Sequence, residues 1–126
     1  MRDKLLSFGE ISLATKDTTA YSADKLDMNT PALQHTARAG QVYVVFKPAA
    51  AFNAADSYQP ILQDSADDST YATLATGPVI AKPGADDYYM MPIPLKHRRY
   101  LRVGGLPTST GTFTATAVSA WIELGK

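Results

Sequence analysis

The sequence predicts an all-β, single-domain fold in which about eight antiparallel strands pack as a two-sheet sandwich. Short runs rich in Val, Ile, Tyr, Phe and Thr are separated by clusters of Gly, Pro, Asn, Asp and Ser, which is the pattern of strands and turns. Few windows place apolar residues at helical spacing over two turns without an intervening Gly or Pro. With 126 residues, 45% of them hydrophobic and 19% charged, the chain can form one packed core. We therefore expect residues 1–126 to be one domain.

The strand pattern recurs along the whole chain. The expected strands are Glu10–Thr15, Lys25–Met28, Gln41–Phe46, Gln59–Asp64, Tyr71–Leu74, Tyr88–Pro94, Tyr100–Val103 and Thr112–Leu124. Turns are expected between them where proline fixes φ or glycine permits positive φ. These positions are residues 29–31, 39–40, 77–78, 82–86 and 104–107. Residues 32–35 are also compatible with a single helical turn after Pro31.

The side-chain pattern within strands indicates which faces are buried. Gln41–Phe46 is apolar at nearly every position, which predicts a strand covered on both faces, either centrally in the sandwich or under a partner. Thr112–Leu124 is also apolar on both sides, so its second face is either an interface or is buried by the chain's own loops. In Tyr100–Val103 the alternation directs the leucine and the valine to the core and Arg102 outward.

Prolines lie inside several strand-like runs, at Pro60, Pro92 and Pro94. Proline cannot donate a hydrogen bond to a β-ladder. These strands are therefore predicted to lie at sheet edges or to carry breaks.

The formal net charge is zero, but charge is segregated along the chain. Residues 1–47 hold six Lys/Arg and five Asp/Glu, residues 48–95 hold one against six, and residues 96–126 hold five against one. This pattern argues against a general nucleic-acid binder and indicates docking of basic segments onto acidic ones, between copies or on a protein partner.

The sequence has no cysteine, no signal-peptide core and no apolar window near the ~18 residues of a membrane span. We therefore expect a soluble protein that is not exported.

Signatures of catalysis and metal binding are missing from the sequence. A serine triad needs a positioned base and a metal site needs clustered imidazoles, but the chain has two histidines, His35 and His97, and no Gly-x-Ser-x-Gly motif. Residues 64–69 hold closely spaced carboxylates without the central glycine and terminal glutamate of an EF-hand loop. A solvated acidic turn is the better interpretation, with adventitious Ca²⁺ binding as the alternative. We expect no enzymatic activity, no cofactor and no metal.

Two further clusters are candidates for partner binding. Residues 96–99 (Lys-His-Arg-Arg), together with Arg102, form the densest positive stretch. This stretch is either a charged loop or a site where arginines bind carboxylates of a neighbouring protein in a two-pronged fork. Residues 88–91 (Tyr-Tyr-Met-Met) could stack on sugar rings, but strand alternation predicts that half of this set faces the core.

Several segments together resemble a known family. They are Asp3–Phe8, Ser22–Asp27, Ile61–Ser65, Leu95–Val103, Thr110–Ala115 and Val118–Ile122. In these segments the chain is similar to the jelly-roll capsid cement proteins of tailed phages, the family typified by the Bordetella phage cement protein. The resemblance covers most of the chain as short pieces. It departs from the family pattern at residues 103–107, where the family implies a strand that continues with bulkier residues.

The resemblance implies a two-sheet antiparallel jelly roll that decorates the outside of an icosahedral phage head and ties neighbouring major capsid proteins together. It implies synthesis in the host cytoplasm, incorporation into the virion and a homodimer, with a trimer as the alternative and with no nucleic-acid or membrane partner. The alternative function is a carbohydrate- or receptor-binding jelly-roll module of a phage fibre that uses Tyr88 or Tyr89. Residues 1–8 are interpreted as an N-terminal arm. The residues expected to contact partners are Arg2, Lys4, Leu5, Phe8, Lys96, Arg98, Arg99 and Arg102.

Overall fold

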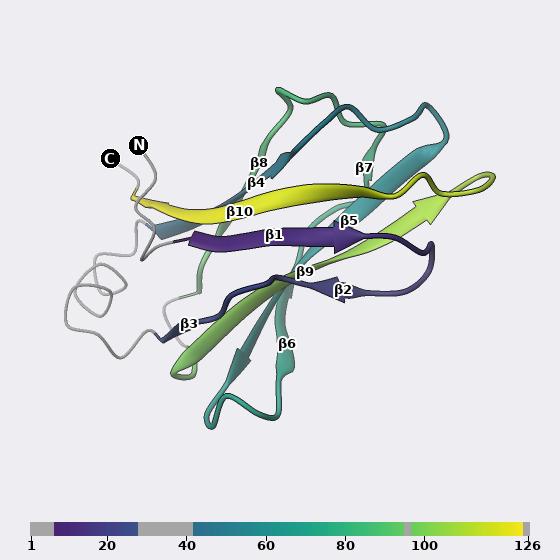
Figure 1. Cartoon of the computed structure of the whole chain (residues 1–126). Helices are drawn as coiled ribbons and strands as arrows, with labels where there is room; N and C mark the ends of the chain where they lie inside the picture. Colours follow the sequence, from purple (N-terminus) through teal and green to yellow (C-terminus); the bar gives the residue numbers. More distant parts are fainter. Residues whose placement is uncertain (1–6, 28–41, 95–96, 125–126) are drawn as a thin grey trace.

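The computed structural model describes residues 7–27, 42–94 and 97–124, and over these ranges it is all-β (Figure 1). The strands are β1 (Ser7–Leu13), β2 (Ala20–Tyr21), β3 (Leu26–Asp27), β4 (Val42–Pro48), β5 (Asp56–Ser65), β6 (Ala72–Thr76), β7 (Ile80–Ala81), β8 (Tyr89–Pro92), β9 (Tyr100–Ser109) and β10 (Thr116–Leu124). Every pairing between them is antiparallel. The helical turn expected at residues 32–35 lies outside the described residues.

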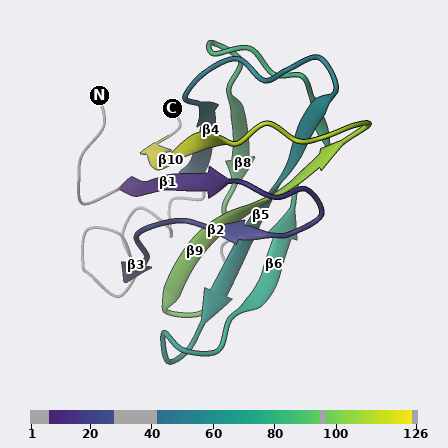
Figure 2. The same ribbon diagram turned by 45° about the vertical axis from the view of Figure 1, so that its right-hand side comes forward.

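The strands form two sheets with jelly-roll topology. The first sheet has the order β1-β10-β4-β8 and the second the order β2-β9-β5-β6, with β3 also paired to β9 and β7 also paired to β5. Because β2 and β3 follow one another along β9, and β6 and β7 along β5, each pair occupies one position of its sheet. Each sheet then has four positions, which is the double-sheet arrangement of a jelly roll and confirms the predicted sandwich of about eight strands. Figure 2 shows the β5–β6 hairpin at one end of the second sheet, with β9 beside it.

The hydrophobic core lies between the two sheets and follows the alternation of the strands. Val44, Phe46 and Ala120 enter it from the first sheet, and all three are 0% exposed. Leu62 and Val103 enter it from the second sheet and are equally inaccessible. Each fully buried Val, Leu or Phe side chain contributes about 1.5–3 kcal/mol relative to an exposed one. The core therefore joins the two sheets along their central strands.

Pro60 lies in β5, a strand with partners on both sides. Its carbonyl accepts the main-chain N–H of Gly77 at 2.9 Å. In an antiparallel strand the N and O of one residue point to the same side, so the donor that proline lacks also faces β6 and β7. The outer neighbour of β5 is broken into those two strands at this point. The prediction for proline-containing strands is thus confirmed, because Pro60 coincides with a break and Pro92 lies in the edge strand β8.

Strand β9 continues to Ser109, and the turn expected at residues 104–107 was wrong. The glycines in this stretch do not reverse the chain but let neighbouring segments pack closely against β9. A Cβ added to Gly104 would lie 2.7 Å from the carbonyl oxygen of Ala20 and 2.9 Å from the ring of Tyr21. Strand β2 therefore packs against β9 where glycine leaves space for it.

Strand β10 begins at Thr116, four residues later than the sequence predicted. The preceding residues turn into the structure instead of pairing. Phe113 is 7% exposed and packs edge-on against Phe52, with ring centroids 6.0 Å apart. The N–H of Thr114 donates to the buried carboxylate of Asp56 at 3.0 Å. These contacts replace the ladder hydrogen bonds that the expected strand would have made.

The central strands of the first sheet carry apolar side chains on the face opposite the core as well, next to Lys47, Ser119 and Glu123 on the same face. Strand β4 lies between β10 and β8, and Val45, on the face opposite the core, is 2% exposed. Its register partners are Trp121 on β10 and Met90 on β8. We call Val45, Met90 and Trp121 the outer apolar patch.

Replacement of Gly104 tests the close approach of β2 to β9. Gly104→Ala should lower the free energy of unfolding by about 1–3 kcal/mol, because the added methyl group overlaps the backbone of Ala20 and the ring of Tyr21. Urea unfolding followed by tryptophan fluorescence measures this change. Gly111→Ala is the matched control, because a Cβ there meets no atom within 4 Å, and it should unfold like the wild type. Equal stability of the two variants would contradict the packing.

Candidate functional site

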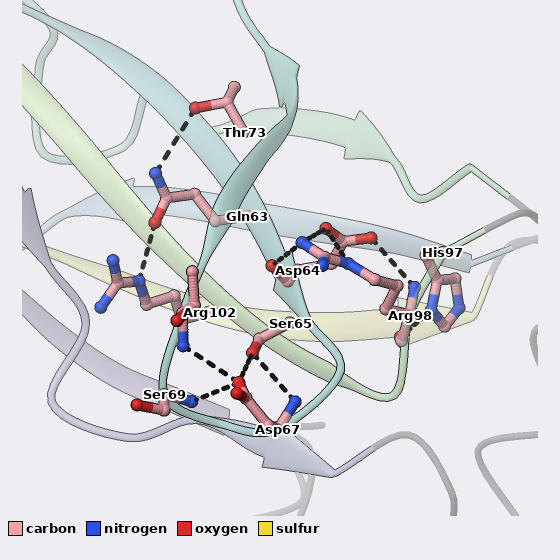
Figure 3. Close-up of polar contacts among 10 residues, drawn as sticks. Gln63, Asp64, Ser65, Asp67, Ser69, Thr73, His97, Arg98 and Arg102 are labelled. Atoms are coloured by element: carbon pink, nitrogen blue, oxygen red, sulfur yellow. Dashed lines mark hydrogen bonds and ion pairs between the residues drawn. The ribbon is translucent and has the colours of Figure 1, made fainter.

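The basic segment that the sequence singled out lies at one end of the second sheet. Arg98 and Arg99 directly precede β9, and Arg102 lies within it. Figure 3 shows this end together with the last residues of β5 and the loop that follows them. Strand β3 also pairs with β9 here. The fold thus gathers charged side chains from segments that are distant in the sequence.

Arg98 is bound by Asp64 of β5. The carboxylate accepts hydrogen bonds from the Arg98 main-chain N–H at 2.9 Å, from Nε at 3.2 Å and from Nη2 at 3.0 Å. Nη2 also donates to the main-chain carbonyl of Asp64 at 2.9 Å. Burial alone raises the pKa of the Asp64 carboxyl, but the hydrogen bonds and charge of Arg98 outweigh burial and hold this pKa below its ordinary value. The carboxylate that Arg98 binds therefore belongs to its own chain.

Arg99 forms a second fork, with Asp27 of β3. Nε donates to Oδ1 at 2.9 Å and Nη2 to Oδ2 at 2.8 Å. The hydrogen bond to Asp27 raises the pKa of the Arg99 guanidinium above its ordinary value. The guanidinium also lies 4.9 Å from the centroid of the Tyr100 ring. This pair ties the short strand β3 to the beginning of β9.

Arg102 is held by different groups. Its Nε donates to Oε1 of Gln63, its register partner on β5, at 2.7 Å. Its guanidinium carbon lies 3.8 Å from the centroid of the Tyr21 ring and 4.2 Å from that of Tyr71. Gln63 is itself fixed, because its Nε2 donates to the hydroxyl of Thr73 at 3.4 Å (Figure 3). We call Arg102, Gln63, Tyr21 and Tyr71 the Arg102 clamp.

The acidic loop after β5 uses its first carboxylate to cap its own backbone. Oδ1 of Asp67 accepts the main-chain N–H groups of Thr70 and Ser69, each at 3.0 Å, and the hydroxyl of Ser65 at 2.9 Å. These hydrogen bonds lower the pKa of Asp67 to about 2. The geometry is that of the acidic turn predicted from the sequence. Within the described ranges, no group of three or more His, Asp or Glu side chains is arranged to hold a metal.

Asp68 of the same loop fixes the Tyr71 ring beside Arg102. It accepts a hydrogen bond from the Tyr71 hydroxyl and pairs with Nζ of Lys25 at 3.3 Å. The bond from Tyr71 lowers the pKa of the Asp68 carboxyl. Burial, followed by the interaction with Asp68, raises the pKa of the Tyr71 hydroxyl, which therefore stays a neutral donor.

The remaining residues predicted to contact partners are distributed unevenly. Arg2, Lys4, Leu5 and Lys96 lie outside the described residues. His35, one of the two histidines, also lies outside them. His97 is described, and its Nδ1 lies 2.7 Å from the main-chain carbonyl oxygen of Arg98. Contact with a partner by any of the basic residues stays a prediction.

Phe8 requires a correction. It lies in β1, which begins at Ser7, and its side chain is 0% exposed within the core. Gly9, with a φ of 78°, lies where the register of β1 against β10 shifts, and this irregularity hides the strand from a simple alternation pattern. Phe8 therefore stabilises its own chain. The arm interpretation now applies to residues 1–6, which lie outside the described residues.

Residues 88–91 divide between the two faces of the strand as alternation predicts. Met91 is 3% exposed and Tyr89 packs against the core, whereas Tyr88 is 62% exposed and Met90 is 39% exposed. Tyr89 therefore does not add a second ring to a surface platform around Tyr88.

The described residues contain no helix long and apolar enough to cross a membrane.

The fold and this site define the class: a jelly-roll sandwich with an ordered cluster of arginine, tyrosine and aspartate side chains on its second sheet. A family model described as Bbp16 matches residues 13–122. The chain belongs to this Bordetella phage protein family, which confirms the family expected from the sequence. A search of the curated proteins gave no match.

Sequence reasoning missed the residues that hold Arg102. Tyr21 belongs to a two-residue strand too short to give a pattern, and Gln63 lies opposite Arg102 only through the pairing of β5 with β9. A charge run does not reveal such neighbours, because they come from segments distant in sequence. The available signal was Gly104, since a glycine within a strand marks a place where another group approaches closely.

The Asp64–Arg98 contact predicts a loss of stability when its carboxylate is removed. Asp64→Ala should lower the free energy of unfolding by about 1–3 kcal/mol, because a guanidinium and a main-chain N–H lose their acceptor in a half-buried site. Thermal unfolding at pH 7 measures the change. Arg99→Ala, which breaks the more exposed pair with Asp27, is the comparison and should cost less. A larger loss for Arg99→Ala would contradict this ranking.

The lowered pKa of Asp67 predicts how stability depends on pH. Its charged form is favoured by folding, so its contribution is present above the unfolded pKa of about 3.9 and is lost as pH falls towards about 2. Asp67→Ala should therefore unfold at a lower temperature than the wild type at pH 7, with a difference that shrinks between about pH 5 and pH 2.

Calorimetry across this pH range tests the prediction. Asp86→Ala is the control, since Asp86 is exposed and makes no hydrogen bond with the described residues. It should follow the wild type throughout. A difference between Asp67→Ala and wild type that stays constant down to pH 2 would show that the carboxylate does not act through its charge.

Proposed function

We propose that this protein is a capsid cement, or decoration, protein that binds the outside of an icosahedral phage head and stabilises contacts between major capsid proteins. The observation that carries the proposal is membership of the Bbp16 family, whose model matches residues 13–122 of a jelly-roll chain. Family membership indicates a phage structural protein. The cement role is the specific form of that function that we infer.

The geometry supports this role. A cement protein needs a rigid body with surfaces complementary to its partners, and it does not need a reactive cleft. The second sheet is stiffened at its end by two arginine–aspartate forks, Arg98 with Asp64 and Arg99 with Asp27. Single contacts at or below about 1,600 Å² suffice, because repetition over a shell adds avidity.

We further propose that the protein is a homodimer in the virion, made in the host cytoplasm and without enzymatic activity. The outer apolar patch supports association through the first sheet, because Trp121 and Met90 lie on the face opposite the core. A trimer is the alternative, and analytical ultracentrifugation of the purified protein distinguishes the two. The alternative function, a carbohydrate-binding fibre module, loses support because Tyr89 packs against the core.

Binding to phage heads tests the proposal. Purified protein added to expanded heads that lack it should cosediment with them at saturable stoichiometry and should raise the temperature at which they rupture. Heads that already carry the protein are the control and should take up none. The proposal would be abandoned if the purified protein neither bound nor stabilised the deficient heads.

A further inference from the structure

The three arginines at this end of the second sheet differ in what they can offer a partner. Arg98 and Arg99 each use Nε and Nη2 on an aspartate of this chain. Arg102 uses Nε, on Gln63, and within the described ranges its Nη1 and Nη2 donate to no residue. In Figure 3 the dashed line from Gln63 reaches only Nε, and no dashed line joins the two terminal nitrogens to the other residues drawn. The outer edge of this guanidinium therefore keeps its hydrogen-bond donors available.

The guanidinium is also fixed in position before any partner arrives. The Tyr71 ring is held by its bond to Asp68, and the Tyr21 ring lies over Gly104, where a Cβ would come within 2.9 Å of it. Both rings lie within 4.2 Å of the guanidinium carbon of Arg102. Most of the rotamer entropy of a long side chain is thus lost on folding and not on binding.

The charges around Arg102 indicate the chemistry of the ligand. Lys25, Arg98 and Arg99 are each ion-paired within the chain, whereas Arg102 has no carboxylate partner among the described residues. A guanidinium with two free terminal nitrogens matches the two oxygens of a carboxylate. A nucleic-acid backbone would need several unpaired cations along its track, and the neighbouring cations that the structure describes, Lys25, Arg98 and Arg99, are ion-paired. The clamp therefore fits one acidic side chain on a protein surface.

We propose that the Arg102 clamp binds the carboxylate of one aspartate or glutamate on the partner protein. The identification of that partner as the capsid protein of the head rests on the proposed function. Tyr21, which is 40% exposed, lies at the edge of this contact and packs against the partner side chain. Arg102 is then the partner-binding arginine of the basic segment, and Arg98 and Arg99 hold the end of the sheet in shape.

The test measures the affinity of variants for phage heads that lack the protein. Arg102→Gln should bind roughly 10- to 100-fold more weakly than the wild type, because the partner carboxylate loses its charged fork. Arg102→Lys keeps the charge but not the fork or the stacking, and it should recover only part of the affinity. Tyr21→Leu keeps Arg102 and should weaken binding several-fold by loosening the clamp. Lys82→Gln, a charge change on an exposed loop residue, should bind like the wild type.

Competition identifies the ligand class. Soluble polyglutamate should displace the wild type from heads and should displace Arg102→Gln less effectively, whereas duplex DNA at equal charge concentration should displace neither. Displacement by DNA and not by polyglutamate would overturn the carboxylate assignment.

The outcomes separate the two proposals. Failure of the wild type to bind heads would overturn the proposed function and, with it, this partner. Binding of Arg102→Gln and Tyr21→Leu at wild-type affinity would overturn the clamp while leaving the cement function intact. Circular dichroism of each variant establishes that it is folded, and Tyr21→Leu, which alters an exposed ring, keeps the test valid if Arg102→Gln is unstable.

Discussion

The antiparallel pairing of β5 with β9 is the constraint on which the rest of the second sheet depends. It runs from Asp56 opposite Ser109 to Ser65 opposite Tyr100 without a break. One face of this ladder supplies core residues and the other places Gln63 beside Arg102. Because side chains alternate with a period of two, a slip of one residue would expose the core side chains and bury the polar ones. A single register therefore determines both the core and the candidate site.

Buried carboxylates reinforce this register at both ends of β5. Asp56 is 2% exposed and accepts the Ser109 hydroxyl at 2.7 Å as well as the main-chain N–H of Thr114. At the other end Asp64, 6% exposed, accepts three hydrogen bonds from Arg98. A carboxylate buried without such donors would cost several kcal/mol. Alternative registers that leave either Asp56 or Asp64 buried without these hydrogen bonds are therefore disfavoured. The in-chain role of Arg98 follows from this constraint.

The sandwich was predictable from sequence because strand alternation and turn residues are local signals. The doubly apolar β4 and the proline positions carried enough information to predict a central strand, an edge strand and a break. The errors arose where a residue acts on a distant segment. Gly104 looked like a turn because its role concerns β2, and Phe8 looked exposed because the register shift at Gly9 obscures its strand. The partners of the arginines depended on pairings that no local pattern contains, so the basic segment was recognised while its internal forks were not.

Over the residues that the structure describes, the outer strands of both sheets are irregular, interrupted or partly covered. Strand β1 carries the register shift at Gly9, and its Phe8 and Glu10 carbonyls accept the main-chain N–H groups of Asp24 and Ala23. Strand β8 ends at Pro92, and both borders of the second sheet consist of short, interrupted strands. A regular edge with unpaired N–H and C=O groups invites another chain to add a strand, and these edges offer little of that kind. Copies at high concentration are thereby less prone to merge into continuous β-sheet fibres. Contacts with other molecules then fall to the faces and ends of the sandwich, where side chains and not backbone groups determine which neighbours fit.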